Sequence, residues 1–150
     1  MSFEARIMDA MKAAMKAKDT VALESLRAIK SALLLAKTDK GSGAEFSEED
    51  AVILVQKLVK QRKESAAIYT SQGREDLAET ELAQIAVLET FLPAQANQEE
   101  IQVVVDRIIS ELGATGMQDM GRVMGAVTKE LAGSADGSTI SGIVRARLSQ

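Results

Sequence analysis

The chain has 150 residues, of which 46% are hydrophobic, 3% aromatic and 27% charged, and it contains neither cysteine nor histidine. This length is sufficient to bury one hydrophobic core or two small ones. The lack of cysteine and histidine excludes a disulfide framework, a thiol nucleophile, an imidazole general base and the usual structural zinc site. We therefore expect no metal and no cofactor.

Acidic side chains outnumber basic ones by 22 to 18, which gives a net charge of -4. The excess is local, because residues 41–100 carry twelve acids against five bases, whereas residues 1–40 carry five acids against eight bases. Contact with RNA would therefore require a local basic surface. The chain shows neither a signal-peptide pattern at its start nor an apolar stretch long enough to cross a membrane, so we predict a cytoplasmic protein without membrane contact.

Apolar residues recur at three- and four-residue spacing along most of the chain, among residues of high helix propensity. This pattern predicts an all-α, multihelical fold without strands. Asp19, Ser47, Asn97 and Ser138 are placed to cap helices. The predicted helices cover about residues 3–18, 20–39, 48–71, 75–92, 98–112, 117–131 and 138–148.

The only proline, Pro93, lies between two strongly helical patterns. Since a helix usually ends before a proline, we expect a linker at residues 93–97. It would separate an N-terminal four-helix subdomain, residues 1–92, from a C-terminal three-helix subdomain, residues 98–150. In the latter, Met117, Met120 and Met124 are expected to pack in the core.

No group of acids, lysines and hydroxyls converges in the pattern of an active site, so we predict no catalytic residues. Arg62 falls within the apolar stripe of the third predicted helix. A cation in that position must extend to solvent, bind a surface ligand or pair with a carboxylate. We expect a structural ion pair, with Asp76, Glu81 or Glu89 as the partner.

Three lysines, Lys57, Lys60 and Lys63, recur every three residues on the same predicted helix. A solvated charged face explains this spacing without any function. The alternative is a ridge that contacts phosphates, together with a basic stripe on the second predicted helix that contains Arg27, Lys30 and Lys37. With only four aromatic residues in the chain, such a surface would contact the RNA backbone and not stack on bases.

Two groups of short motifs run through the chain. The first comprises Lys60-Gln61-Arg62-Lys63-Glu64-Ser65, Gly73-Arg74 and Phe91-Leu92-Pro93, preceded by Leu26-Arg27-Ala28-Ile29-Lys30-Ser31. The second comprises Asp119-Met120-Gly121-Arg122-Val123-Met124-Gly125, Ala135-Asp136-Gly137 and Ile143-Val144-Arg145. Together they resemble the YqeY-like proteins over nearly the whole chain.

The resemblance implies two all-helical subdomains, similar to the tail domain of the B subunit of glutamine-dependent tRNA amidotransferase, which grips tRNA. It implies binding without catalysis, because the amide-transfer chemistry of those enzymes belongs to other domains and subunits. We therefore expect a weak adaptor for tRNA or for an enzyme that handles tRNA. The candidate RNA contacts are Lys57, Lys60, Lys63, Arg74, Arg122, Arg145 and Arg147.

Two other interpretations stay open at this point. The acidic middle segment or an exposed apolar edge would serve equally well in a protein–protein interaction module that binds no RNA. A carbon–nitrogen ligase activity would follow from family relationship alone, with no catalytic residue to carry over. Salt dependence separates the first two, because phosphate contacts weaken steeply with salt and apolar interfaces do not.

Overall fold

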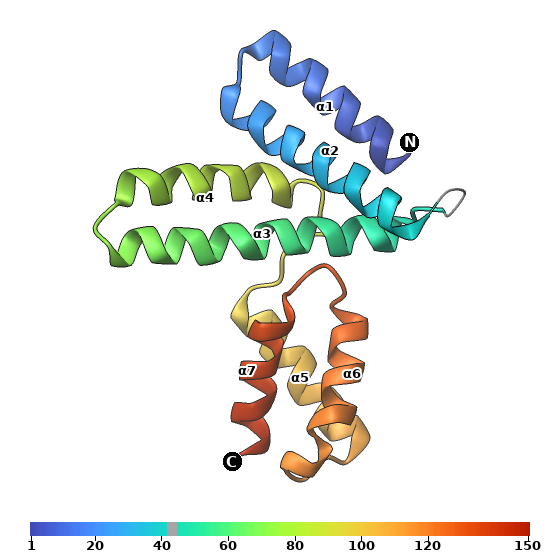
Figure 1. The fold of residues 1–150 in the computed structure, drawn as a ribbon. Helices are drawn as coiled ribbons and strands as arrows, with labels where there is room; N and C mark the ends of the chain where they lie inside the picture. The colour runs from blue at the N-terminus through green and yellow to red at the C-terminus, as the bar shows by residue number, and fades with distance from the viewer. Residues whose placement is uncertain (42–44) are drawn as a thin grey trace. The chain divides into compact units, whose positions relative to one another are not determined.

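A computed structural model of the protein describes residues 1–41 and 45–150. These residues form seven α-helices, one short 3-10 helix and no strand (Figure 1). The predicted all-α, multihelical fold is confirmed. The chain divides into two compact units, Met1–Leu92 (unit 1) and Pro93–Gln150 (unit 2), each with its own hydrophobic core.

Unit 1 consists of two helical hairpins. α3 and α4 lie side by side and antiparallel, α2 packs against both of them, and α1 packs against α2 (Figure 1). The bounds are α1 Phe3–Ala17, α2 Thr20–Lys40, α3 Glu48–Ser71 and α4 Glu75–Glu89. Apolar residues from all four helices meet in one core, whose most deeply buried members include Ile7, Leu26, Ile29, Val55 and Leu88.

The helix starts follow three of the four predicted caps. Ser138 is not the cap of the last helix, because the Asp136 carboxylate accepts from the Thr139 amide at 2.7 Å and caps it instead. The Asp19 carboxylate accepts a hydrogen bond from the Ala22 amide at 3.0 Å at the start of α2. Ser47 and Asn97 each form a capping box, with Asp50 and Glu100 respectively. These side chains satisfy backbone N–H groups that the first turn of a helix leaves without partners.

α4 ends at Glu89, three residues earlier than the sequence predicts. The amides of Phe91 and Leu92 donate to carbonyls three residues back, so the chain leaves the helix in tight turns before Pro93. These turns bring Phe91 to the unit 1 core, where its ring meets Phe3 edge-on with 6.1 Å between ring centroids. A contact across almost ninety residues of sequence therefore fixes the end of the helix.

Unit 2 is a bundle of three α-helices with one 3-10 turn. α5 spans Gln98–Leu112, the 3-10 helix η1 Met117–Asp119, α6 Met120–Glu130 and α7 Gly137–Leu148. The predicted methionine core is wrong in part. Met117 is exposed and Met120 and Met124 are half-buried, whereas the fully buried residues of α6 are Val123 and Val127. The shorter valines fit the closely packed interior, and the long, flexible methionines fill its margin.

Candidate functional site

Three exposed lysines on α3 form a basic surface of unit 1. α3 turns Ala51, Val55, Val59 and Ala66 toward the core. Lys57, Lys60 and Lys63 lie on the other sides of the helix and are exposed. None of them takes part in an ion pair with any residue that the structure describes. We call these three residues the lysine ridge.

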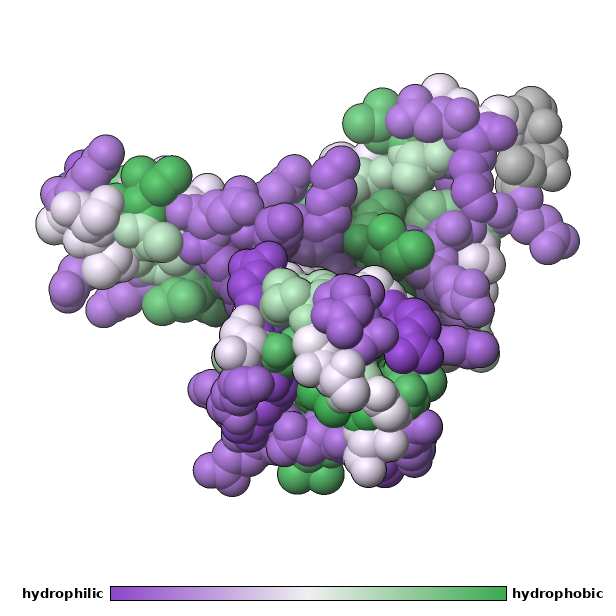
Figure 2. Space-filling view, turned by 90° about the horizontal axis from the view of Figure 1, so that it is seen from below, coloured by the Kyte–Doolittle hydropathy of each residue, from purple (hydrophilic) through white to green (hydrophobic). Residues whose placement is uncertain are grey.

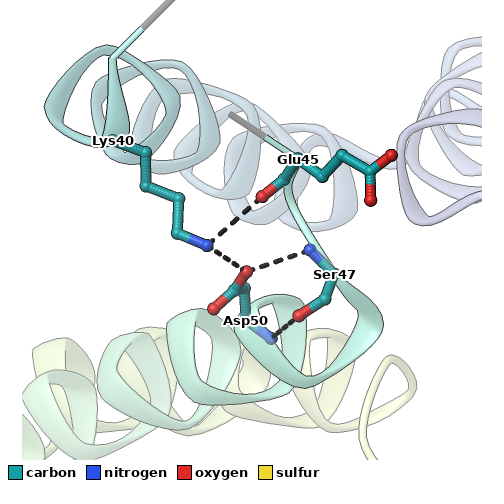
Figure 3. Close-up of polar contacts among 4 residues, drawn as sticks. All are labelled: Lys40, Glu45, Ser47 and Asp50. Atoms are coloured by element: carbon teal, nitrogen blue, oxygen red, sulfur yellow. Dashed lines mark hydrogen bonds and ion pairs between the residues drawn. The ribbon is translucent and has the colours of Figure 1, made fainter. Parts of the chain in front are cut away.

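The start of α3 is held by a polar cluster around Asp50 (Figure 3). One Asp50 carboxylate oxygen accepts hydrogen bonds from Lys40 Nζ at 2.5 Å and from the Ser47 amide at 3.0 Å. Lys40 Nζ also donates to the Glu45 carbonyl at 3.2 Å. The Lys40 contact, followed by the two Ser47 hydrogen bonds, lowers the pKa of Asp50 to about 2. This cluster joins the end of α2 to the helix that carries the lysine ridge.

Arg62 has a different partner from the one the sequence predicts. Its Nε donates to Gln84 Oε1 at 2.9 Å, and the Gln84 amide nitrogen donates to Glu24 Oε2 at 3.3 Å. None of the ion pairs in the described part of the chain contains Arg62, so Asp76, Glu81 and Glu89 do not pair with it. An amide from α4 thus connects the half-buried cation on α3 to a carboxylate on α2.

Three of the candidate arginines are paired with carboxylates. Arg74 holds Asp76 through two hydrogen bonds, of 3.1 and 3.0 Å. This contact raises the pKa of Arg74 and lowers the pKa of the Asp76 carboxyl. Arg122 pairs with Asp119 at 2.9 Å, and Arg147 Nε lies 3.0 Å from Asp106 Oδ1. Each pair reduces the positive charge offered to a polyanion.

Arg145 is exposed on α7 and belongs to none of the ion pairs formed by the described residues. Arg122 donates to the Leu112 carbonyl at the end of α5, and Ser149, directly after α7, contacts Met117 in η1. Arg122 and the last turn of α7, which carries Arg145, therefore lie toward the same end of unit 2. The structure therefore brings together the lysine ridge within unit 1, whereas in unit 2 Arg147 is turned toward Asp106 on α5 and Arg122 toward Asp119.

The basic stripe on α2 is smaller than the sequence suggests. Arg27 and Lys30 are exposed, but Lys37 pairs with Glu4 on α1. This contact joins residues 33 positions apart, so helix periodicity alone gives no sign of it. The lysine ridge consequently offers three neighbouring basic side chains without carboxylate partners in the described residues, more than remain unpaired on α2.

An apolar groove between α2 and α3 is a feature that sequence reasoning missed. It has a volume of about 450 Å³ and is lined mainly by Ala32, Leu35, Phe46, Ile53, Leu54 and Leu58. Leu35 and Ile53 are each 64% exposed. The face of the molecule drawn in Figure 2 is mostly hydrophilic, with smaller hydrophobic patches between the polar side chains. The sequence does indicate exposed apolar side chains on these helices, through the runs Leu33-Leu34-Leu35 and Val52-Ile53-Leu54-Val55. Consecutive residues of a helix cannot all face one core, so some members of each run must lie on the surface.

Within the described residues, no group of three or more acidic side chains is placed to hold a metal ion. None of the helices described is long and apolar enough to cross a membrane.

Comparison with known proteins gives a match to the Yqey-like protein family over residues 4–148. The chain belongs to the Yqey-like family. The motifs of both units lie within the matched range, so the predicted resemblance is confirmed.

Relatives of this Yqey-like chain include fungal proteins named "Altered inheritance of mitochondria protein 41, mitochondrial". The Clavispora lusitaniae protein is 29% identical over 123 residues, which cover 81% of this chain and 69% of the relative. The Pyrenophora tritici-repentis protein is 30% identical over 133 residues, covering 87% and 71%. For the Kluyveromyces lactis protein the identity is 32% over 104 residues, covering 68% and 56%.

The names of these relatives contradict one prediction. The sequence of this Yqey-like chain led us to expect a cytoplasmic protein, yet the relatives are named as mitochondrial. The cytoplasmic prediction rested on the pattern of the chain's first residues and on the lack of a membrane-spanning stretch, neither of which reports the compartment of a folded domain.

Proposed function

We propose that this Yqey-like protein is an RNA-binding helical module that contacts the tRNA backbone through the lysine ridge. One observation carries the proposal. Lys57, Lys60 and Lys63 are exposed side by side on α3 without carboxylate partners among the described residues, in a chain with a net charge of -4. The resemblance to the tRNA-gripping tail of the amidotransferase B subunit supports the same conclusion.

The geometry favours phosphates as the ligand. The lysine ridge extends from Lys57 to Lys63, a rise of six residue steps that corresponds to about 9 Å along the helix axis. Aromatic side chains are not placed to stack on bases, because Phe3 is buried and Phe46, Tyr69 and Phe91 are half-buried. The module therefore reads the RNA backbone and shape instead of sequence.

Weak binding follows from the overall charge. The field of the acidic residues opposes the approach of RNA, and only the local surface attracts it. We expect a dissociation constant for tRNA in the micromolar range or weaker at low salt, from about two to four phosphate contacts.

The experiment compares two triple variants of equal charge change. Replacing Lys57, Lys60 and Lys63 by Gln should raise the dissociation constant for tRNA about tenfold in a fluorescence anisotropy titration near 50 mM salt. The matched control replaces Lys12, Lys16 and Lys18 of the α1 region, which are also exposed and outside the ion pairs of the described residues. If both variants bind tRNA equally, the lysine ridge is not part of the interface, and the net charge alone accounts for any loss of affinity.

A separate variant, Arg145→Gln, tests unit 2. Arg145 is the only one of the three unit 2 candidates that forms no ion pair within the described residues. If unit 2 shares in the binding, this substitution weakens it further when added to the ridge variant. An unchanged dissociation constant limits the contact to unit 1.

A further inference from the structure

We propose that the groove between α2 and α3 is the interface of a homodimer, in which a second copy of this chain packs against it about a two-fold axis. The inference goes beyond RNA binding and rests on an apolar surface, which shares Lys57 with the lysine ridge. Leu35 on α2 and Ile53 on α3 project beside an apolar floor, each with 64% of its surface exposed. Exposed aliphatic side chains gathered along a groove indicate a surface that another protein covers.

The two charged side chains of the groove that have no ion-pair partner in the described part of the chain are of opposite sign. Four charged residues line it, Asp39, Lys40, Asp50 and Lys57. Lys40 and Asp50 neutralise each other in the cluster at the start of α3. Asp39 and Lys57 belong to none of the ion pairs of the described residues.

Asp39 and Lys57 lie toward opposite ends of the groove. Asp39 precedes Lys40, whose ammonium contacts Asp50 and lies 5.9 Å from the centre of the Phe46 ring. Lys57 comes seven residues after Asp50, about two helical turns further along α3. The groove therefore carries a carboxylate at one end, an ammonium at the other and apolar side chains between them.

Such a surface is complementary to itself. A two-fold axis through the middle of the groove places Asp39 of each copy against Lys57 of the other, and brings the Leu35 and Ile53 side chains of both copies together near the axis. The projecting side chains of one copy then fill the groove of its partner, as ridges fill grooves in helix packing. Any other partner would have to match the same charge order, whereas a second copy carries it already.

The test exchanges the charges at the two ends of the groove. Sedimentation of the full chain over a range of protein concentrations measures the monomer–dimer equilibrium of each variant. We expect the wild type to dimerise, and either Asp39→Lys or Lys57→Glu alone to raise the dimer dissociation constant at least tenfold, since each places like charges at two symmetric contacts. The double variant, with both substitutions, should return to within about threefold of the wild type, because it exchanges the charges between the two ends.

Substitution of exposed leucines provides a second test of the dimer interface. Leu35→Gln should abolish the dimer, whereas Leu82→Gln, on the exposed side of α4 with 55% exposure, should leave it unchanged. Both positions are exposed, so neither substitution removes a core contact, and circular dichroism verifies the helical content. Asp39→Lys and Leu35→Gln keep all three ridge lysines, so loss of the dimer is distinguishable from loss of RNA binding.

Three results would overturn the proposal. They are a wild type that stays monomeric up to millimolar concentration, single charge reversals that leave the equilibrium unchanged, and a double variant that fails to restore the dimer.

Discussion

The guanidinium of Arg62 lies beside the apolar core and forms its hydrogen bonds with uncharged groups. It is half-buried, and it donates to the side-chain amide of Gln84 and, at 3.4 Å, to the Leu58 carbonyl. Uncharged acceptors satisfy the guanidinium without bringing a second charge out of water. Removing Arg62 therefore leaves no unpaired buried carboxylate behind.

We predict that Arg62→Met lowers the free energy of unfolding by about 1 kcal/mol, the usual contribution of one such hydrogen bond, instead of the roughly 3 kcal/mol expected on breaking a buried ion pair. Urea denaturation measures the difference. A double-mutant cycle with Gln84→Leu should give a coupling energy similar to the loss from the single variant. A loss of about 3 kcal/mol without coupling to Gln84 would mean that Arg62 has a carboxylate partner after all.

Asp50 makes the stability of unit 1 depend on pH. The contacts with Lys40 and Ser47 lower the pKa of Asp50 from 3.8 to about 2 in the folded protein. The ionised carboxylate therefore contributes stability above its ordinary pKa, and this contribution is lost as the pH falls from about 4 toward 2.

The expected result is a difference in melting temperature between the wild type and Asp50→Asn that is constant from about pH 7 to pH 5 and shrinks toward zero near pH 2. Thermal denaturation followed by circular dichroism provides the measurement. Asp9→Asn, an exposed carboxylate outside the ion pairs of the described residues, controls for the loss of one negative charge. A difference that does not vary with pH would contradict the role assigned to the Asp50 contacts.

At the scale of the helices, local chemistry predicts the starts better than the ends. Asp19, Ser47 and Asn97 cap their helices through side chains only three residues from the amides they accept from, so the signal lies within one turn of sequence. The end of α4 depends instead on Phe91 meeting Phe3, a contact that no local pattern contains. The same holds for Val123 and Val127, because the choice between valine and methionine as core depends on packing.

Two glycines of unit 2 should respond to alanine in opposite directions. Gly113 ends α5 with a φ of 64°, a conformation that L side chains rarely adopt, whereas Gly125 lies inside α6. A Cβ atom at either position would meet nothing within 4 Å, so only the backbone preference acts.

Gly113→Ala should therefore destabilise the protein by about 1 kcal/mol, and Gly125→Ala should stabilise it by about 0.5 to 1 kcal/mol. Chemical denaturation of the two variants beside the wild type gives both values. Changes of the same sign would show that contacts other than the backbone conformation control these positions.

At the scale of the whole molecule, the hydrophobic cores are two: one is built from residues of unit 1 and the other from residues of unit 2. We predict that Leu88→Ala, at a fully buried position of unit 1, lowers the stability of that unit by about 3 kcal/mol. Native-state hydrogen exchange should then show faster exchange in α2, α3 and α4 and unchanged protection in α5, α6 and α7. A parallel loss of protection in both units would mean that they unfold as one.

The charged surface is where sequence reasoning was least complete. Periodicity places Lys57, Lys60 and Lys63 outside the core, but it does not indicate which basic residues have carboxylate partners. Arg147 pairs with Asp106 across 41 residues of sequence, and Lys37 pairs with Glu4 across 33. These two pairs depend on the tertiary fold, whereas Arg74 and Arg122 pair with carboxylates only two and three residues away. Four of the seven RNA candidates keep their charge unpaired among the described residues and three do not.

RNA binding by the lysine ridge is tested most directly by the salt dependence of the dissociation constant for tRNA. Between about 25 and 200 mM salt, a plot of log Kd against log salt concentration should rise for the wild type with a slope of about 2 to 3, as expected for three phosphate contacts. The slope should fall close to zero when Lys57, Lys60 and Lys63 are replaced by Gln, and stay at the wild-type value for the Lys12, Lys16 and Lys18 variant. Equal slopes for all three proteins, or no binding by the wild type near 50 mM salt, would contradict the proposed function.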